Sequence, residues 1–521
     1  MSFVQFIHFE QIDKRIRYDK IKPVKAIIKG LMSIFNFVYF LKIIQKGGKM
    51  STKTVEKVEK DEKKSKKSTI FALKDKFFEK KRYFISFGIL SVLTILGLIY
   101  SIYETRLDFV IDNLSINKAD TAFMFISTLL VMIMTPGLAL FYGGMVRKKN
   151  VLGTLMQSFI SLGLITIIWV LVGYSLAFGP DKCHLIGGLD WALLRNVGLI
   201  PSESYATNVP HYLFMLFQMM FAALTPALIT GSFAGRFRFK SFMIFLALWV
   251  LLIYCPLAHW VWGEGGWIRN LGGLDFAGGL VVHIGSGAAA LAACLILGKR
   301  HGYKKEIMPP HNLTLTFIGT TLLWFGWFGF NGGSALEANS LAISALAVTQ
   351  VAAAAGMMSW LLVEWAQRGK PTMLGAMSGV LAGLVGITPA AGFVSVSGAL
   401  AIGFLSGAFC YYCVSLKSKL GYDDSLDAVG IHGSGGVLGS ILTGVFASTL
   451  INPDGANGLI FGSFHLLKIQ LISTIAAVVF SFIGTYILLK IVDKFSSLRL
   501  SEEEEMQGLD ITQHSENCYR F

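Results

Sequence analysis

Eleven apolar runs, each of a length that crosses a bilayer as a helix, dominate the sequence between residues 119 and 490. A membrane-spanning helix needs about 20 apolar residues, with a range of about 17–25. With 54% hydrophobic and only 15% charged residues among 521, the chain carries too much apolar surface for a soluble globule. We therefore predict an all-α polytopic membrane protein. The runs lie at about 120–142, 154–178, 209–233, 239–260, 275–298, 312–331, 340–364, 372–388, 394–415, 428–449 and 466–490.

Basic residues divide unevenly between the two sets of connections, with 14 after the odd-numbered runs and four after the even-numbered ones. Lys and Arg are enriched in loops that remain in the cytoplasm, so the odd-numbered connections are predicted to be cytoplasmic. The core then starts outside the cell, and the C-terminus lies in the cytoplasm. We expect the protein to reside in the inner (plasma) membrane. The first set is Arg147, Lys148, Lys149, Arg236, Arg238, Lys240, Lys299, Arg300, Lys304, Lys305, Arg368, Lys370, Lys417 and Lys419, and the second is Lys182, Arg195, Arg269 and Lys468.

The N-terminal part is strongly basic, because residues 1–82 hold 22 Lys and Arg against 9 Asp and Glu. Acidic residues alternate with the lysines, so a cytoplasmic extension is favoured over a nucleic-acid-binding segment. Residues 1–49 are interpreted as a start-site artefact, because Met50 begins a polar N-terminus of its own. The apolar run at 83–103 is either a signal sequence or an anchor helix, and its flank has no small-x-small cleavage pattern. Residues 119–490 form the predicted core, and 491–521 a polar C-terminal tail.

Two histidines, His283 and His432, lie inside glycine-rich apolar runs, where ionisable groups are rare and usually functional. Each is preceded by an aspartate, Asp275 or Asp427, and followed closely by Gly-Ser-Gly. The histidines fall on the fifth and tenth runs, and similar Phe-Tyr/Asn-Gly-Gly endings close the first and sixth. We therefore predict a five-plus-five inverted repeat with one additional helix. The neighbouring glycines predict close helix packing around a narrow bore.

Other site types are less well supported by the residues. Each histidine could simply donate a hydrogen bond between helices, and the paired repeat argues against that. No third His, Cys or carboxylate ligand accompanies them, so neither a metal nor a haem is predicted. Cys410 and Cys413 lie in an apolar run without a second pair, and the glycines at 433–439 lack the strand and Lys-Ser/Thr of a phosphate loop. The sequence therefore predicts no cofactor and no enzyme.

Several motifs together resemble the ammonium transporter (Amt/MEP/Rh) family, of the bacterial Amt type. The similarity extends from about Asp120 to the C-terminus. The motifs are Pro136-Gly-Leu-Ala-Leu-Phe-Tyr-Gly-Gly144, Asp275 to His283, Trp327-Phe-Gly-Phe-Asn-Gly-Gly-Ser334, Gly369-Lys-Pro371 and Gly430-Ile-His-Gly433.

The resemblance implies transport of ammonium or ammonia through a narrow hydrophobic bore. It implies an outer recruitment site formed by Phe221, Trp262 and Ser334, with Phe221 and Phe330 closing the bore beneath it. Aromatic faces attract a cation by about 0.5–2 kcal/mol each, and a hydroxyl can accept from ammonium.

The family also implies roles for Asp275 and the histidines. Asp275 would lie near the entrance, either fixing the loop before the fifth helix or adding negative potential. His283 and His432 would share a hydrogen bond and line the pore. Because imidazole titrates near neutrality, such a pair can relay a proton. The net species and charge moved are left open.

The resemblance has further implications for assembly and regulation. It implies a homotrimer in the lipid bilayer, and an ordered cytoplasmic tail that accommodates a PII-type signalling protein. One departure is Gly235, where relatives usually carry Glu before the arginine, so a local salt bridge is expected to be missing. An alternative is an ammonium sensor that signals through a PII-type partner.

Overall fold

The computed structural model describes residues 116–519, together with residues 94, 95 and 97. The predicted extension at 1–82 and nearly all of the apolar run at 83–103 lie outside them. Among the described residues, ten helices are long and apolar enough to cross a membrane. Each of the eleven predicted core runs coincides with an apolar helix, but α14 (Met373–Ile387) has only 15 residues and falls short of the other ten.

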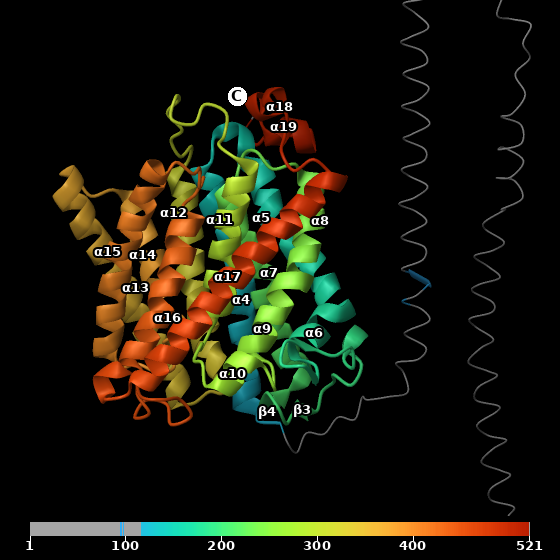
Figure 1. Ribbon diagram of the computed structural model, residues 1–521, viewed down its shortest axis with the longest axis vertical. Coiled ribbons are helices and arrows are strands. Elements are labelled where there is room, and N and C mark those ends of the chain that lie inside the picture. Colours follow the sequence, from blue (N-terminus) through green and yellow to red (C-terminus); the bar gives the residue numbers. More distant parts are fainter. Residues whose placement is uncertain (1–93, 96, 98–115, 520–521) are drawn as a thin grey trace, which may run out of the picture. The chain divides into compact units, whose positions relative to one another are not determined.

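The helices follow one another with short connections (Figure 1). Two predicted runs, 154–178 and 239–260, are each divided into two named helices by a turn of different pitch. Their bounds are α4 (Lys118–Met145), α5 (Val151–Ile168), α6 (Tyr174–Phe178), α7 (His211–Phe233), α8 (Phe239–Trp249), α9 (Cys255–Trp262), α10 (Trp267–Leu271), α11 (Gly285–Leu297), α12 (Leu313–Trp327), α13 (Ser340–Arg368), α14 (Met373–Ile387), α15 (Val396–Leu420), α16 (Ser434–Phe446), α17 (Phe464–Phe495), α18 (Glu502–Gln507) and α19 (Leu509–His514).

One turn of π-helix interrupts or begins five of these spans. A π turn accommodates one extra residue in a helix and is found mostly at functional sites. Three of the five carry residues that the sequence singled out, namely His283, Phe330 and His432. The turns are η3 (Trp169–Gly173), η5 (Val250–Tyr254), η6 (Gly279–Ile284), η7 (Phe328–Gly332) and η9 (Val429–Gly433).

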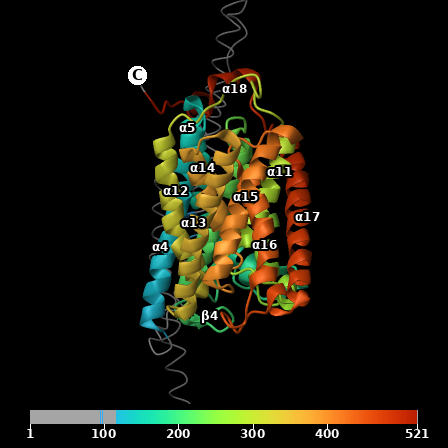
Figure 2. The same cartoon turned by 90° about the vertical axis from the view of Figure 1, so that its left-hand side faces the viewer.

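The helical core has two distinct faces, which Figures 1 and 2 place at opposite ends of the long helices. The tail face carries α18 and α19. The far face carries two short antiparallel hairpins, β1 (Asp181–Lys182) with β2 (Ile186–Gly187) and β3 (Pro201–Ser202) with β4 (Ala206–Pro210). The long helices run between the faces, with α12 beside α4 and α17 beside α11.

The fifth and tenth spans run in opposite directions. Arg300 follows the end of α11, and Asp423 precedes η9, yet the Arg300 guanidinium bonds both carboxylate oxygens of Asp423 at 2.7 and 2.9 Å. The end of one span and the start of the other therefore lie on the same face. This is the arrangement that an inverted repeat requires.

Glycines allow the two spans to touch through their backbones. A Cβ added to Gly287 would lie 2.2 Å from the Cα and N of Gly433, a distance that no side chain tolerates. A Cβ on Gly436 would lie 3.0 Å from the Cβ of His283. Small residues permit this approach in a membrane, where packing rather than the hydrophobic effect drives helix association.

Large apolar side chains are exposed along the outer helices rather than hidden. Phe125 and Ile126 on α4, Phe159 on α5 and Ile475 on α17 are each more than half exposed. A soluble protein rarely exposes contiguous apolar surface on this scale. The outward surface is therefore suited to lipid.

The C-terminal tail folds onto the tail face. Ser501 and Glu504 form a capping box that starts α18. The Asp510 carboxylate accepts from the Gly153 amide at 2.9 Å, near the N-terminus of α5, where a negative charge is favourable. The Leu509 amide donates to the side chain of Asn150 at 3.0 Å. These bonds hold the tail against the connection between α4 and α5.

The backbone geometry at position 235 and the hydrogen bonds of the next residue, Arg236, both bear on why a glycine occupies this position. The φ of Gly235, +86°, lies in the left-handed region, and an added Cβ would lie 2.7 Å from the Asn150 amide nitrogen. The adjoining Arg236 is fully buried, and its guanidinium donates to neutral oxygens of Ser232, Asp423 and Ser425 at 2.7–3.0 Å. Backbone and hydroxyl acceptors thus serve Nη1 and Nη2 without a neighbouring glutamate, whereas the buried Nε has no hydrogen-bond partner among the described residues.

Candidate functional site

His283 and His432 meet in the core, although 149 residues separate them in the chain. Their Nδ1 atoms are 3.3 Å apart, and the ring centroids are 5.3 Å apart with planes only 18° from parallel. The two residues are 1% and 4% exposed. A single proton must lie between the facing Nδ1 atoms, because two N–H groups there would repel each other. The ring that accepts at Nδ1 then carries its only proton on Nε2, and the ring that donates has a bare Nε2.

An aspartate caps the π turn that carries each histidine. The Asp275 carboxylate accepts from the amides of Gly278, Gly279, Leu280 and Val281 at 2.6–3.2 Å. Acceptors for these amides are needed because the first turn of a helix has no internal partners. Four bonds to one carboxylate favour the structural role for Asp275 over that of a free negative charge.

The matching cap in the second repeat is Asp424, which corrects the expectation that Asp427 occupies this position. Asp424 accepts from the amides of Ala428 and Val429 at 3.2 and 2.8 Å. Asp427 instead has a φ of +64° and forms an ion pair with Lys417. The spacing from cap to histidine is then identical, since 283 − 275 and 432 − 424 both equal eight. We call residues 275–297 and 424–446 the first and second histidine segments.

A column of aromatic rings leads from the far face to the histidines. Trp262 packs its edge against Phe221, with centroids 6.1 Å apart at 88°. Phe221 stacks on Phe330 at 4.3 Å, and the Phe330 ring lies 6.1 Å from His283. Phe221 and Phe330 are almost completely buried, at 1% and 0% exposed. The two phenylalanines predicted to close the bore are thus buried and stacked on each other.

A cavity of about 230 Å³ opens above this pair of rings on the far face. Three of the four residues predicted for recruitment line it, namely Phe221, Trp262 and Ser334. The Ser334 hydroxyl donates to the carbonyl of Phe330 at 2.8 Å, so its oxygen can accept a hydrogen bond from a ligand. Asp275, predicted near the entrance, is not among the lining residues. It contacts the site through its own carbonyl, which accepts from the Trp262 indole at 2.9 Å.

Two residues of this cavity escaped the sequence analysis. Gln218 lines the cavity and is 9% exposed, and its buried Oε1 is an acceptor without a hydrogen-bond partner among the described residues. Its place three residues before Phe221 puts both on one face of α7, and this spacing could have identified it. Arg269 also lines the cavity, but a connecting segment gave no pattern that would have placed it there.

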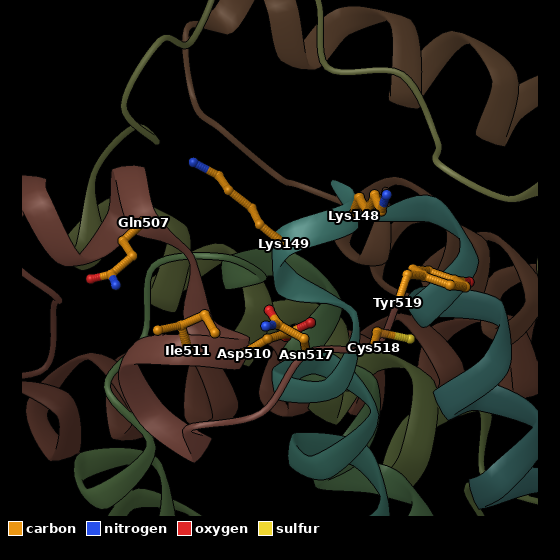
Figure 3. Close-up of a pocket in the computed structure, with 8 residues that line it drawn as sticks. All are labelled: Lys148, Lys149, Gln507, Asp510, Ile511, Asn517, Cys518 and Tyr519. Carbon is orange, nitrogen blue, oxygen red and sulfur yellow. The ribbon is translucent and has the colours of Figure 1, made fainter. Parts of the chain in front are cut away.

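A second hollow, of about 210 Å³, lies on the tail face between the tail and η2 (Lys148–Asn150). Figure 3 shows Lys148 and Lys149 on one side of it and the tail residues, including Asp510 and Tyr519, on the other. The Lys148 ammonium lies 5.6 Å from the centre of the Tyr519 ring. This hollow belongs to the junction of tail and core, and the ring column does not reach it.

The part of the chain that the structure describes contains no group of three or more His, Cys, Asp or Glu side chains placed to hold a metal ion. The facing imidazoles stand alone among aromatic and aliphatic neighbours. Their chemistry is therefore that of hydrogen-bond donation, acceptance and proton exchange between two rings.

Comparison with known proteins points to one family. A family model described as the Ammonium Transporter Family matches residues 122–519. The ammonium transporter of Bacillus subtilis is 55% identical over 402 residues, which cover 77% of this chain and 98% of that protein. Ammonium transporter Amt1 of Archaeoglobus fulgidus is 47% identical over 403 residues, covering 77% and 100%.

Solved structures agree. The crystal structure of Saccharomyces cerevisiae Mep2 matches with a TM-score of 0.71 at 40% identity, over 75% of this chain and 89% of that one. A solved protein named Sensor Amt Protein matches with a TM-score of 0.70 at 30% identity, over 76% and 98%.

Proposed function

Because this chain belongs to the ammonium transporter family, we propose that it transports ammonium through the column of rings between Trp262 and His432. The observation that carries the proposal is the 3.3 Å approach of the His283 and His432 Nδ1 atoms directly beneath the stacked phenylalanines. Burying two imidazoles in an apolar column costs free energy. Ionisable groups inside a membrane are therefore rare and usually functional.

Recruitment takes place in the far-face cavity. The faces of Trp262 and Phe221 attract a small cation, by about 0.5–2 kcal/mol each. The oxygens of Ser334 and Gln218 accept two of its N–H bonds. A tetrahedral donor satisfies these acceptors better than a spherical alkali ion, because hydrogen bonds depend on direction.

Passage requires Phe221 and Phe330 to move apart, since their rings stack at 4.3 Å. A bare cation in this apolar column is strongly disfavoured, so ammonium transfers a proton to the bare Nε2 of the histidine pair as it passes the gate, and ammonia continues. The paired histidines present one Nε2–H and one bare Nε2 to the column. They can therefore donate to ammonia, accept from it, and exchange the proton that they share.

The wider proposal concerns orientation and assembly. The far face is directed outside and the tail face towards the cytoplasm of the cell that holds the protein in its inner (plasma) membrane, as the distribution of basic residues favours. The protein forms a homotrimer with one column in each subunit. The tail, held at Asn150 and Gly153, offers a regulatory surface for a PII-type partner.

Currents in proteoliposomes test the central proposal. Purified protein is exposed to steps of ammonium or potassium, and uptake of labelled methylammonium is measured in parallel to detect transport without charge. We expect a response to ammonium that potassium does not elicit. His283→Ala and His432→Ala should each change its size or selectivity, whereas His465→Ala, at an exposed position on α17, should not.

The outcomes separate the parts of the proposal. Absence of both current and uptake in the wild type contradicts transport itself. Wild-type behaviour in both histidine variants removes the imidazole pair from the mechanism and leaves the transport function intact. Size-exclusion profiles of all variants establish that each is folded.

A second candidate function is an ammonium sensor, supported by the match to the protein named Sensor Amt Protein. A sensor would bind ammonium at Trp262 and change its tryptophan fluorescence without moving the ion. Fluorescence titration together with the uptake measurement distinguishes the two functions.

A further inference from the structure

The far-face cavity is unusual for a site that recruits a cation. Thirteen described residues line it, and its only charged side chain is Arg269, which is positive. The other lining groups are aromatic, aliphatic, hydroxyl or amide. Any cation that enters therefore meets a charge of its own sign and no lining carboxylate.

The Arg269 side chain is held in place at the mouth. It lies on α10, is exposed, and donates from Nη1 to the backbone carbonyl of Trp262 at 2.8 Å. Within residues 116–519, no carboxylate forms an ion pair with it. The charge is therefore fixed beside the recruitment rings and is not neutralised by a direct partner.

Carboxylates do occur next to the cavity. Glu203 and Glu337 line an adjoining hollow of about 160 Å³, which shares Ser204, Tyr205 and Leu336 with the cavity. This hollow attracts cations of every valence, and divalent ions most strongly, because Coulomb energy is proportional to ionic charge. Selective recruitment of ammonium therefore requires that divalent cations be excluded between this hollow and the aromatic rings.

We propose that Arg269 is a specificity-determining residue that filters cations by valence at the mouth. The inference rests on the proposed function and adds to it a role for a residue outside the ring column. The fixed guanidinium charge penalises a divalent cation twice as much as ammonium. Ammonium recovers the loss through the ring faces and by donating to Ser334 and Gln218, whereas a hydrated divalent ion cannot. Potassium has the same charge as ammonium, so Arg269 does not distinguish the two.

Substitution of Arg269 gives a quantitative test in the same proteoliposomes. Arg269→Gln removes the charge and keeps a donor for the Trp262 carbonyl, while Arg269→Lys keeps the charge. A unit charge about 6 Å from a cation in water-like surroundings changes its binding about threefold. At low ionic strength we expect Arg269→Gln to lower the ammonium concentration for half-maximal current about threefold. The maximal current should stay within about twofold, because the charge acts on recruitment.

Competition by magnesium is the sharper measurement. Because the energy doubles for a divalent ion, Mg²⁺ should inhibit Arg269→Gln at about ninefold lower concentration than it inhibits the wild type. Arg269→Lys should behave as wild type, and the relative response to potassium should be unchanged in both. The differences should largely disappear near 1 M salt, where charges are screened beyond about 3 Å. Arg195→Gln, an exposed far-face arginine outside the cavity, is the matched control.

Two results would overturn the filter. One is equal inhibition by magnesium in wild type and Arg269→Gln at low ionic strength. The other is an equal fall in maximal current for the Gln and Lys variants, which would assign Arg269 to positioning Trp262 instead. Both presuppose a wild-type ammonium response, so failure of transport itself is recognised separately.

Discussion

In the first histidine segment the Asp275 carboxylate accepts four backbone hydrogen bonds, whereas in the second the Asp424 carboxylate accepts two. The second cap also lies in a network of charges, because Lys417 donates to the Asp424 carbonyl at 2.9 Å and pairs with Asp427. Asp423 next to it is bound by Arg300. No charged side chain is bonded to the Asp275 carboxylate among the described residues.

The comparison separates what the two segments share from what they do not. Both keep an aspartate eight residues before the histidine and a π turn between them, which together bring the imidazoles into contact. The second segment has its cap beside an ionic network on the tail face, whereas the first segment reaches the tail only at its other end, where the Leu297 carbonyl accepts from Arg499. The shared parts position the rings, and the differing parts decide how each end responds to its surroundings.

Substituting the two capping aspartates should produce the largest difference in stability between the two segments. Asp275→Ala leaves four backbone amides of a buried turn without their acceptor, and we expect a loss of about 4 kcal/mol in stability. Asp424→Ala leaves two, with an expected loss of about 2 kcal/mol. Thermal unfolding in a single detergent measures both, with the exposed Asp454→Ala as the control. Equal losses would show that the number of capped amides does not distinguish the segments.

The second prediction concerns the close backbone contact between Gly287 and Gly433, where the two histidine segments cross. Gly287→Ala places a methyl group 2.2 Å from the backbone of Gly433, which cannot move without shifting His432. We expect a loss of about 3 kcal/mol and a weaker ammonium response. Gly163→Ala on α5 is the matched control, because its Cβ would meet nothing within 4 Å. It should be neutral or slightly stabilising. Similar melting of the two variants would mean that the helices can separate freely at the crossing.

Much of the fold could be predicted because a bilayer imposes a simple rule on the sequence. Each span needs about 20 apolar residues, so the runs located the helices, and the mostly helical membrane fold and the family membership are confirmed. The π turns could not be predicted, because one inserted residue barely alters an apolar pattern. Asp427 was paired with Asp275 because it begins the second glycine-rich segment, but its left-handed backbone directs the chain differently, and Asp424 caps the turn.

The candidate site was predictable only in part, for a related reason. Motifs named His283, His432, Phe221 and Phe330, but ring distances depend on packing between helices that are remote in sequence. Arg269 shows the limit most clearly, because only the folded connection brings it beside Trp262. Helical periodicity predicts which residues of a span share a face, whereas a connecting segment such as the one with Arg269 has no period from which its neighbours can be predicted.

The smallest predicted effect is a pH dependence at Asp424, the cap of the second segment. Burial raises the pKa of Asp424 from 3.8 to about 6, against the opposing charge of Lys417. The native state then binds an extra proton between about pH 4 and pH 6, so this group stabilises the fold at low pH, and the contribution is lost as the pH rises through 6. Burial also raises the pKa of Asp423, but hydrogen bonds from Arg300 and the nearby guanidinium charges outweigh it, and the net pKa is lowered. Its effect falls below that window.

Asp424→Asn should therefore flatten the pH dependence of thermal stability between pH 4 and pH 6. The wild type should lose about 2 kcal/mol more than the variant over that interval. Asp423→Asn tests whether the slope belongs to Asp424, because its own titration lies lower and the slope should persist. A slope that survives Asp424→Asn would place the proton elsewhere in the tail-face network. The contrast between the two segments would then reduce to the number of backbone amides that each cap accepts from.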